Sequence, residues 1–222
     1  MANHPSDKDD EGYSDRADSI DCRTAFQCRK NGIEIVNKLS AIGYWKLVLF
    51  GKPESDRAIY KAAAKAMPLS IVEFGLENAV RAENIIRVVQ RRCEDSAPIK
   101  YTGIDLFEGR PSGEKSLPLI EAHRKLSRTG AKIRLLPGDF VSSIQRLANQ
   151  LQNVDLMIVT ARQPMNEISA SWFFVPRMLS ESGFLMLKCT GEGDETFLRM
   201  SRKEIETLAQ RTGPNNASRR IA

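Results

Sequence analysis

An acid and a glycine at the end of an apolar run, Glu73 and Gly75, have the types and spacing expected of a binding site. An apolar strand that enters a glycine turn and then a helix brings the backbone close to a ligand and directs helix N–H groups toward it. Gly75 supplies one glycine of such a turn, whereas Glu77 and Ala79 stand where two more are expected. Segment 71–79 therefore predicts a nucleotide-binding turn that lacks two of its glycines.

The elements expected around this turn alternate between strand and helix. The candidate strands are mostly continuous apolar runs, as is typical of strands covered on both faces: 70–74, 99–105, 131–136, 154–159 and 184–188. Apolar residues at helical spacing lie between them: Ala82, Ile85, Ile86, Val89 and Cys93; Leu119, Ala122, His123 and Leu126; and Ile144, Leu147, Ala148 and Leu151. This alternation predicts an α/β fold with a doubly wound, mainly parallel sheet.

Four more helices are expected, one of them, at 168–179, within this alternation and the other three outside it. One carries Ile33, Val36, Leu39 and Ile42 and ends before Gly43; a second begins at Ser55 or Asp56 and is stopped by Pro68. A third, at 168–179, is rich in aromatic residues and disturbed by Pro176. The last follows the fifth strand and opens with a capping box, Ser201 to Glu204.

These patterns divide the chain into a disordered acidic tail (1–21), a helical N-terminal cap (22–69), an α/β domain (70–212) and a flexible tail (213–222). The polar N-terminus does not resemble a secretory signal peptide, and no apolar run reaches the roughly 20 residues that span a bilayer. The expected location is the cytoplasm, with no membrane contact. The four cysteines, at 22, 28, 93 and 189, form no CxxC pair and are expected to be reduced, two of them in the core.

The charge is unevenly distributed. Residues 1–21 hold seven acids and two bases, a net −5 within a chain of net +5, so residues 22–222 carry +10. A basic body could attract an anionic partner. The basic residues are scattered over several expected helices, however, and no aromatic side chains interleave them as a stacking platform requires. This pattern favours a solvated surface over nucleic-acid binding.

Four of these features in register resemble the class I S-adenosylmethionine-dependent methyltransferases, over roughly residues 70–188. In that family the first strand ends in an acid and a glycine turn, as at Glu73 and Gly75. The second strand ends in an acid that holds the ribose hydroxyls, where Asp105 stands. A Gly-Asp pair often lies beside the adenine after the third strand, where Gly138 and Asp139 stand.

The resemblance implies a Rossmann-like methyltransferase fold that binds S-adenosylmethionine. The cofactor-binding residues that it implies are Glu73, Gly75, Glu77, Asp105 and Asp139. Asp105 could equally be a turn residue or a helix cap, an N-cap is favoured for Asp139, and Glu73 could serve only to orient the turn. A Glu77 carboxylate held 4 Å from the cofactor's own carboxylate would cost about 4 kcal/mol at an effective dielectric of 20. It could instead turn to solvent or pair with the cofactor's ammonium group.

Catalytic and metal-binding residues are not evident. Metal-dependent relatives place acids after the fourth strand, but this chain reads Thr160 to Gln163 without a carboxylate, so no metal is expected. His123, mid-helix, is more typical of a core or surface-edge position than of a general base. The aromatic cluster Trp172 to Phe174, with Trp45 and Phe50, is expected in the core rather than in an acceptor pocket.

Two functions remain open from the sequence. The first is S-adenosylmethionine-dependent methyl transfer to a small-molecule acceptor, at oxygen. The alternative is a non-catalytic binding or scaffold protein of the same fold that has lost the cofactor, which Glu77 and Ala79 favour. In that case Glu77→Gly would create or improve cofactor binding.

Overall fold

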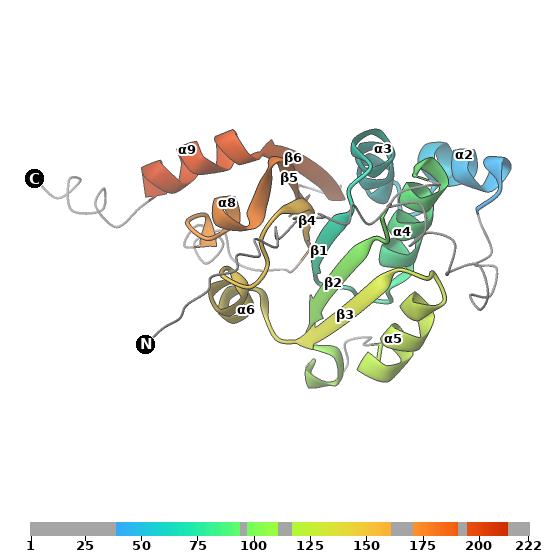
Figure 1. The fold of residues 1–222 in the computed structure, drawn as a ribbon, viewed down its shortest axis with the longest axis horizontal. Coiled ribbons are helices and arrows are strands. Elements are labelled where there is room, and N and C mark those ends of the chain that lie inside the picture. Colours follow the sequence, from blue (N-terminus) through green and yellow to red (C-terminus); the bar gives the residue numbers. More distant parts are fainter. Residues whose placement is uncertain (1–38, 94–96, 111–116, 161–170, 191–194, 213–222) are drawn as a thin grey trace, which may run out of the picture. The chain divides into compact units, whose positions relative to one another are not determined.

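The computed structural model describes residues 39–93, 97–110, 117–160, 171–190 and 195–212, which form a six-stranded sheet with helices on both faces (Figure 1). The strands are β1 (Ser70–Phe74), β2 (Lys100–Asp105), β3 (Lys132–Pro137), β4 (Val154–Val159), β5 (Leu179–Thr190) and β6 (Glu195–Ser201). Their order in the sheet is β3-β2-β1-β4-β5-β6, with β5 and β6 antiparallel and the other pairs parallel. The predicted doubly wound, mainly parallel α/β sheet is confirmed.

The helices divide into two layers because strand residues alternate between the faces of the sheet. The first layer is α2 (Ala41–Phe50), α3 (Asp56–Ala66), α4 (Val80–Arg92) and α5 (Leu119–Ser127). The second is α6 (Phe140–Leu147), α8 (Val175–Met178) and α9 (Arg202–Thr212). Ile71 and Tyr101 pack into the first core, whereas Val72 and Ile104 pack into the second. A 3₁₀ turn, η1 (Phe107–Gly109), follows β2.

The strand order places a switch point at β1. From β1 the chain proceeds outward to β2 and β3, and it then returns to the other side of β1 to form β4 and β5. In open α/β sheets the connections diverge at such a point and leave a crevice outside the carboxyl ends of the strands. The turn that follows β1, residues 75–79, lies at this switch point.

The C-terminal part differs from the prediction. β6 was not expected; its sequence has one buried side chain, Met200, and therefore gives no strand signal. It forms because β5 is longer than predicted and offers it an edge, from Phe184 opposite Ser201 to Thr190 opposite Glu195. The predicted capping box at α9 is confirmed, since the Ser201 hydroxyl and N–H both donate to the Glu204 carboxylate.

Two expected helices also differ. Of the aromatic helix expected at 168–179, residues 168–170 lie outside the described part, residues 172–174 form a turn, and α8 follows, with Pro176 in its first turn, where proline is tolerated. The N-terminal helix does not end before Gly43, because α2 begins after Ser40 and continues through Gly43. Residues 33 and 36 lie outside the described part, as do Cys22 and Cys28. Cys93 and Cys189 are free thiols, both partly buried.

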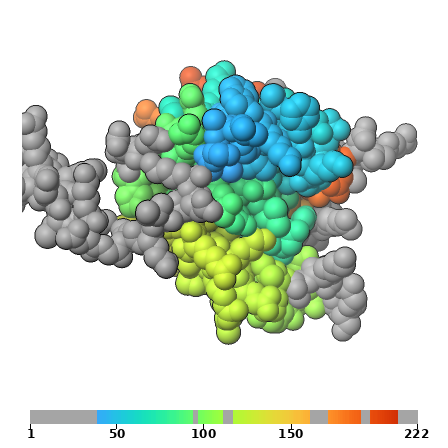
Figure 2. Space-filling model, turned by 90° about the vertical axis from the view of Figure 1, so that its right-hand side faces the viewer, coloured from blue at the N-terminus to red at the C-terminus, as the bar shows by residue number. Residues whose placement is uncertain are grey.

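One face of α2 is apolar and exposed. Trp45, Phe50 and Phe173 have 58%, 70% and 55% of their surface accessible, so the expectation that they lie in the core is wrong, whereas Trp172 is buried as expected. Figure 2 shows α2, in blue, on the surface of the molecule. The helix is apolar on nearly all sides and packs only the side that carries Val48, so the opposite side remains exposed. Among the helices of the described residues, none is long and apolar enough to cross a membrane.

Candidate functional site

Four parallel strands are level with one another at or near their carboxyl ends. Ile104 pairs with Phe74, Phe74 with Val159, and Val159 with Leu187. The residues that follow these in the chain are therefore level with one another: Asp105, Gly75, Thr160 and Lys188. This edge presents an acid, a glycine, a hydroxyl and a lysine over β2, β1, β4 and β5.

The turn after β1 has a glycine-like backbone at three positions. The φ angles are 90° at Gly75, 55° at Glu77 and 57° at Ala79. A left-handed conformation costs a residue with a Cβ about 1–2 kcal/mol. The Ala79 N–H donates to the Leu76 carbonyl at 2.9 Å and closes the turn before α4. The two residues that replace glycines therefore keep the conformation that glycine would adopt, at a cost in strain.

Replacement of Glu77 by glycine should stabilise the protein. Because φ at Glu77 is 55°, Glu77→Gly relieves left-handed strain and should raise the free energy of unfolding by about 1 kcal/mol. Urea denaturation measures this change. Glu77→Ala, which removes the charge but keeps a Cβ, should remain within about 0.5 kcal/mol of the wild type. Equal stability of the two variants would show that the turn is not strained.

Asp105 joins the end of β2 to this turn. Its Oδ2 accepts hydrogen bonds from the Leu76 N–H at 2.6 Å and the Glu77 N–H at 3.2 Å, and its Oδ1 accepts one from the Phe107 N–H at 3.1 Å. Arg110 bridges the same carboxylate, with Nε 2.9 Å from Oδ1 and Nη2 2.7 Å from Oδ2. Burial alone would raise the pKa of Asp105, but the hydrogen bonds from Arg110 and Phe107 outweigh it and lower the pKa. Asp105 is therefore an ionised, heavily bonded acid beside the turn.

The Leu76 side chain packs closely against Gly103 on β2, which fixes the position of Leu76. A Cβ at Gly103 would lie 2.7 Å from Leu76 Cδ1 and 2.9 Å from Leu135 Cδ2, so only glycine lets Leu76 pack onto the sheet there. Leu76 is 1% exposed. With its side chain buried and its N–H bonded to Asp105, Leu76 holds the turn against the sheet.

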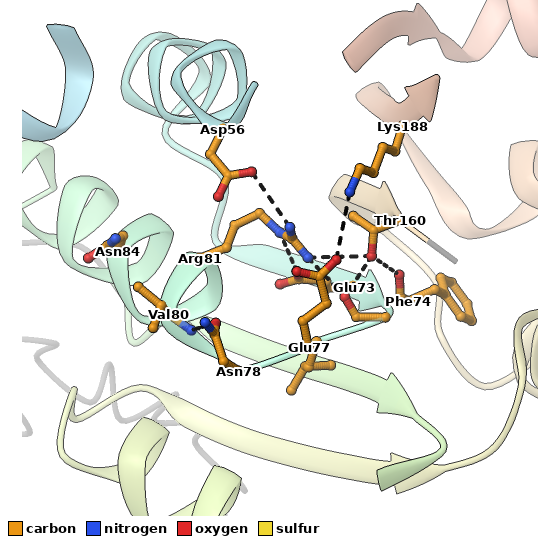
Figure 3. Close-up of polar contacts among 12 residues, drawn as sticks. Asp56, Glu73, Phe74, Glu77, Asn78, Val80, Arg81, Asn84, Thr160 and Lys188 are labelled. Carbon is orange, nitrogen blue, oxygen red and sulfur yellow. Dashed lines mark hydrogen bonds and ion pairs between the residues drawn. The ribbon is translucent and has the colours of Figure 1, made fainter. Parts of the chain in front are cut away.

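Glu73 lies below the turn in a buried ionic cluster with Arg81 (Figure 3). Glu73 is fully buried; its Oε1 is 2.7 Å from Arg81 Nε, and its Oε2 accepts a hydrogen bond from the Tyr101 hydroxyl at 2.6 Å. Arg81 also donates to the Gly75 carbonyl at 2.9 Å and lies 3.6 Å from the buried Asp56 Oδ1. Arg81 thus connects the turn to β1 and α3.

The pKa values in this cluster follow from its burial. Burial raises the pKa of Glu73, against the opposing effects of the Arg81 charge and the Tyr101 hydroxyl. Burial also raises the pKa of Asp56, whose Oδ1 accepts no hydrogen bond from the described residues. For Arg81, burial would lower the pKa, but the charges of Glu73 and Asp56 outweigh it and raise the pKa. Arg81 is therefore the charge on which both buried acids depend.

Glu77 extends from the turn toward β5. Its Oε1 is 3.8 Å from Lys188 Nζ, which is itself 2.9 Å from Glu195 Oε2 (Figure 3 shows the Glu77–Lys188 contact). The Glu77 side chain is 49% exposed and that of Lys188 is 12% exposed. Glu77 therefore lies over the carboxyl edge of the sheet, beside a lysine, rather than pointing away from it.

Asp139 caps α6. Its Oδ1 accepts a hydrogen bond from the Ser142 N–H at 2.9 Å, and its Oδ2 contacts the Ser142 hydroxyl. The preceding residue, Gly138, donates its N–H to the Asp105 carbonyl at 2.9 Å, so Asp139 lies in the loop next to Asp105. The hydrogen bonds from Ser142 lower the pKa of Asp139.

Removal of this cap should be measurable. Asp139→Ala should lower the free energy of unfolding by about 1 kcal/mol, and Asp139→Asn, which keeps an acceptor oxygen, by a few tenths. Because the pKa is lowered in the folded state, the charged cap stabilises fully above the unfolded-state pKa and loses its effect as the pH falls through the folded-state pKa. Urea denaturation at several pH values measures both effects; equal losses in the two variants would contradict the capping role.

Other predicted positions lie outside this arrangement. His123 is on the exposed surface of α5, where its Nδ1 is 3.3 Å from the Ser127 hydroxyl. Of the stretch after β4, only Thr160 is described, and its hydroxyl donates to the Gly75 carbonyl at 2.6 Å. In the described part of the chain, no three His, Cys, Asp or Glu residues form a group that could hold a metal ion.

The structure therefore brings Glu77 into direct contact with Asp105 and bonds the Gly75 N–H to the neighbouring Ile104 carbonyl, with Glu73 beneath them and Asp139 in the next loop. The sequence prediction missed the cations that accompany the acids: Arg81, Arg110 and Lys188. For Arg81 a signal was available, since it lies four residues before Ile85 on the buried stripe of α4 and a charge at such a position needs a partner.

No protein-family model matches the chain, and no curated protein matches it. Solved structures of similar fold include a SAM-dependent methyltransferase from Agrobacterium tumefaciens, 14% identical over 71% of this chain and 50% of that one, with a TM-score of 0.46. A Podospora anserina methyltransferase with bound SAH is 15% identical over 90% and 86% of the two chains, with a TM-score of 0.45. A Bacillus cereus O-methyltransferase in complex with SAH is 11% identical over 79% and 86%, with a TM-score of 0.48. The likeness is one of fold.

Proposed function

We propose that the chain binds S-adenosylmethionine at the carboxyl edge of its sheet and transfers the methyl group to a small-molecule acceptor, at oxygen. The observation that carries this proposal is the direct contact between Asp105 and the turn at 75–77, at the switch point of a doubly wound sheet. That is where such sheets bind nucleotide-like ligands, with an acid placed to accept ribose hydroxyls.

The donor set fits the cofactor in part. Asp105 can accept ribose hydroxyls once Arg110 moves away, because its two oxygens now accept five hydrogen bonds. Gly75 and Glu77 lie beside it, Glu73 supports the turn through Arg81, and Asp139 is in the neighbouring loop. When bound, S-adenosylmethionine supplies an electrophilic methyl group. The chain's own contribution is to hold that group beside an acceptor, since a nucleophilic acceptor needs positioning more than a base.

Binding can be tested by titration calorimetry with S-adenosylmethionine and S-adenosylhomocysteine (SAH). We expect micromolar dissociation constants. Hydrogen–deuterium exchange locates the site: SAH should slow exchange of the amides at 75–80 and 105–110 but leave β6 and α9 unchanged. Transfer of a labelled methyl group to hydroxyl-bearing small molecules then tests the reaction.

A second candidate is a non-catalytic binding module. The Arg110 bridge across Asp105 and the strained, non-glycine turn favour it, because both disfavour a bound nucleoside. Under this candidate, millimolar cofactor gives neither heat nor a thermal shift, and methyl transfer is absent. Cofactor binding without transfer to any acceptor would point to a binding protein that still recognises the adenosyl group.

A further inference from the structure

The side chain of Glu77 crosses the edge along which the proposed cofactor would lie. Its N–H donates to Asp105 at the end of β2, while its carboxylate reaches Lys188 on β5, beyond β1 and β4 (Figure 3). Neighbouring strands are about 4.8 Å apart, so the edge between Asp105 and Lys188 is about 14 Å long. A ligand whose ribose rests on Asp105 and whose remainder extends toward β5 must pass the Glu77 carboxylate.

The Glu77 carboxylate has oxygen lone pairs that can accept further hydrogen bonds. Among the described residues its contact is the ion pair with Lys188, and at 3.8 Å that contact is longer than a hydrogen bond. The side chain is about half exposed. An ionised carboxylate can accept about four hydrogen bonds, so a donor on a ligand can bind without displacing a protein group. Glu77 differs in this respect from Asp105 and Glu73, whose oxygens already accept bonds from buried donors.

The surroundings of Glu77 carry an excess of negative charge. Two cations, Arg81 and Lys188, are linked by ion pairs to four acids: Asp56, Glu73, Glu77 and Glu195. The formal charge of this group is therefore −2. Burial raises the pKa of both Asp56 and Glu73, and protonation of either one of them still leaves an excess of acid. Such a field attracts a cation and repels a second carboxylate.

We infer that Glu77 binds the ammonium group at the amino-acid end of the cofactor and replaces with a charged side chain the close backbone contact that glycine would give. This inference rests on the proposed function. On this inference the Glu77 carboxylate strengthens cofactor binding instead of blocking it. The left-handed backbone at Glu77 directs the side chain along the edge of the sheet.

Two ligands separate this role from the rest of the site. SAH carries the amino-acid end, whereas 5′-methylthioadenosine has the same adenosine and sulfur without it. Glu77→Gln keeps the size of the side chain and removes its charge. We expect the variant to bind SAH about tenfold more weakly or worse, through loss of a charge-assisted contact, and to bind 5′-methylthioadenosine as the wild type does. Titration calorimetry gives both constants.

Glu121→Gln, which removes one exposed charge from α5, is the matched control and should leave both constants unchanged. Unchanged or tighter SAH binding by Glu77→Gln would overturn the inference while leaving the proposed function intact; tighter binding would mean that Glu77 repels the cofactor. If the wild type binds neither ligand, the proposed function fails and the inference fails with it.

Discussion

Arg81→Met should lower the free energy of unfolding by about 3–5 kcal/mol at neutral pH, the usual cost of removing one partner from a buried ion pair. Arg81 is 5% exposed and is the cation beside two buried acids, Glu73 at 2.7 Å and Asp56 at 3.6 Å. Methionine retains much of the volume but none of the charge or donors. The variant would leave both carboxylates in the interior and would also release the Gly75 carbonyl that Arg81 now bonds.

Urea denaturation of the variant beside Arg87→Met measures this effect. Arg87 lies on the same helix but pairs with Glu83 at the surface, with 35% of its side chain exposed, so its loss should cost no more than about 0.5 kcal/mol. Adding Glu73→Gln to Arg81→Met removes one stranded charge and should restore at least about 1 kcal/mol. Similar losses for the two arginine variants would mean that the buried cluster contributes no more than a surface pair.

The pH dependence gives a second test of the same variant. An acid whose folded-state pKa is raised binds its proton more tightly in the folded protein than in the unfolded one. The destabilisation it causes is absent below the unfolded-state pKa and grows as the pH rises through the folded-state value. Burial already raises the pKa of Glu73 and Asp56, and loss of the Arg81 charge raises both further. The deficit of Arg81→Met relative to the wild type should therefore shrink as the pH is lowered from about 7 to about 5.

The architecture could be predicted from the sequence because it depends on patterns that are local. Apolar runs such as 70–74 and 154–159 mark strands buried on both faces, and the stripe at Ala82, Ile85 and Val89 marks the helix between β1 and β2. β6 was not predicted because it is stabilised by pairing with β5, which is longer than predicted. Its own sequence is mostly exposed and carries no strand pattern. The exposed face of α2 was not predicted either, because its apolar residues were expected to be buried.

The acids of the site could be located from the sequence, but their partners could not. Strand order brings Asp105 beside the turn, and Glu73 and Asp105 could be placed because they lie at the ends of predicted strands. The cations reach these acids from other elements. Arg81, on α4, is eight residues from Glu73 in the sequence, and Lys188 is on β5, far from Glu77 in the sequence. Pairing across that distance depends on side-chain direction and on the sheet order, which periodicity does not encode. The ion pairs of the site could therefore be identified only from the structure.

Arg110→Ala should strengthen binding of adenosyl ligands by about tenfold to a hundredfold. Arg110 donates two hydrogen bonds to Asp105 at 2.7 and 2.9 Å, on the oxygens that ribose hydroxyls would need. Hydrogen bonding to a charged group contributes about 1.5–3 kcal/mol, and the ligand must displace the Arg110 bridge before it can use Asp105. Without Arg110, Asp105 still accepts bonds from the Leu76, Glu77 and Phe107 N–H groups, so the turn keeps its support. The stability cost should be about 1.5–3 kcal/mol, because the variant loses the same bonds to a buried carboxylate that the ligand would otherwise have to displace.

Titration calorimetry with SAH and with 5′-methylthioadenosine measures this effect. Both ligands carry the ribose, so Arg110→Ala should improve the two equally, in contrast to Glu77→Gln, which should affect SAH alone. Arg87→Ala, which breaks a surface pair on α4, is the matched control and should leave both constants unchanged. Weaker binding by Arg110→Ala would mean that the arginine contacts the ligand instead of blocking it. The Asp105–Arg110 bridge would then be part of the binding surface, and ribose recognition would have to come from groups other than Asp105.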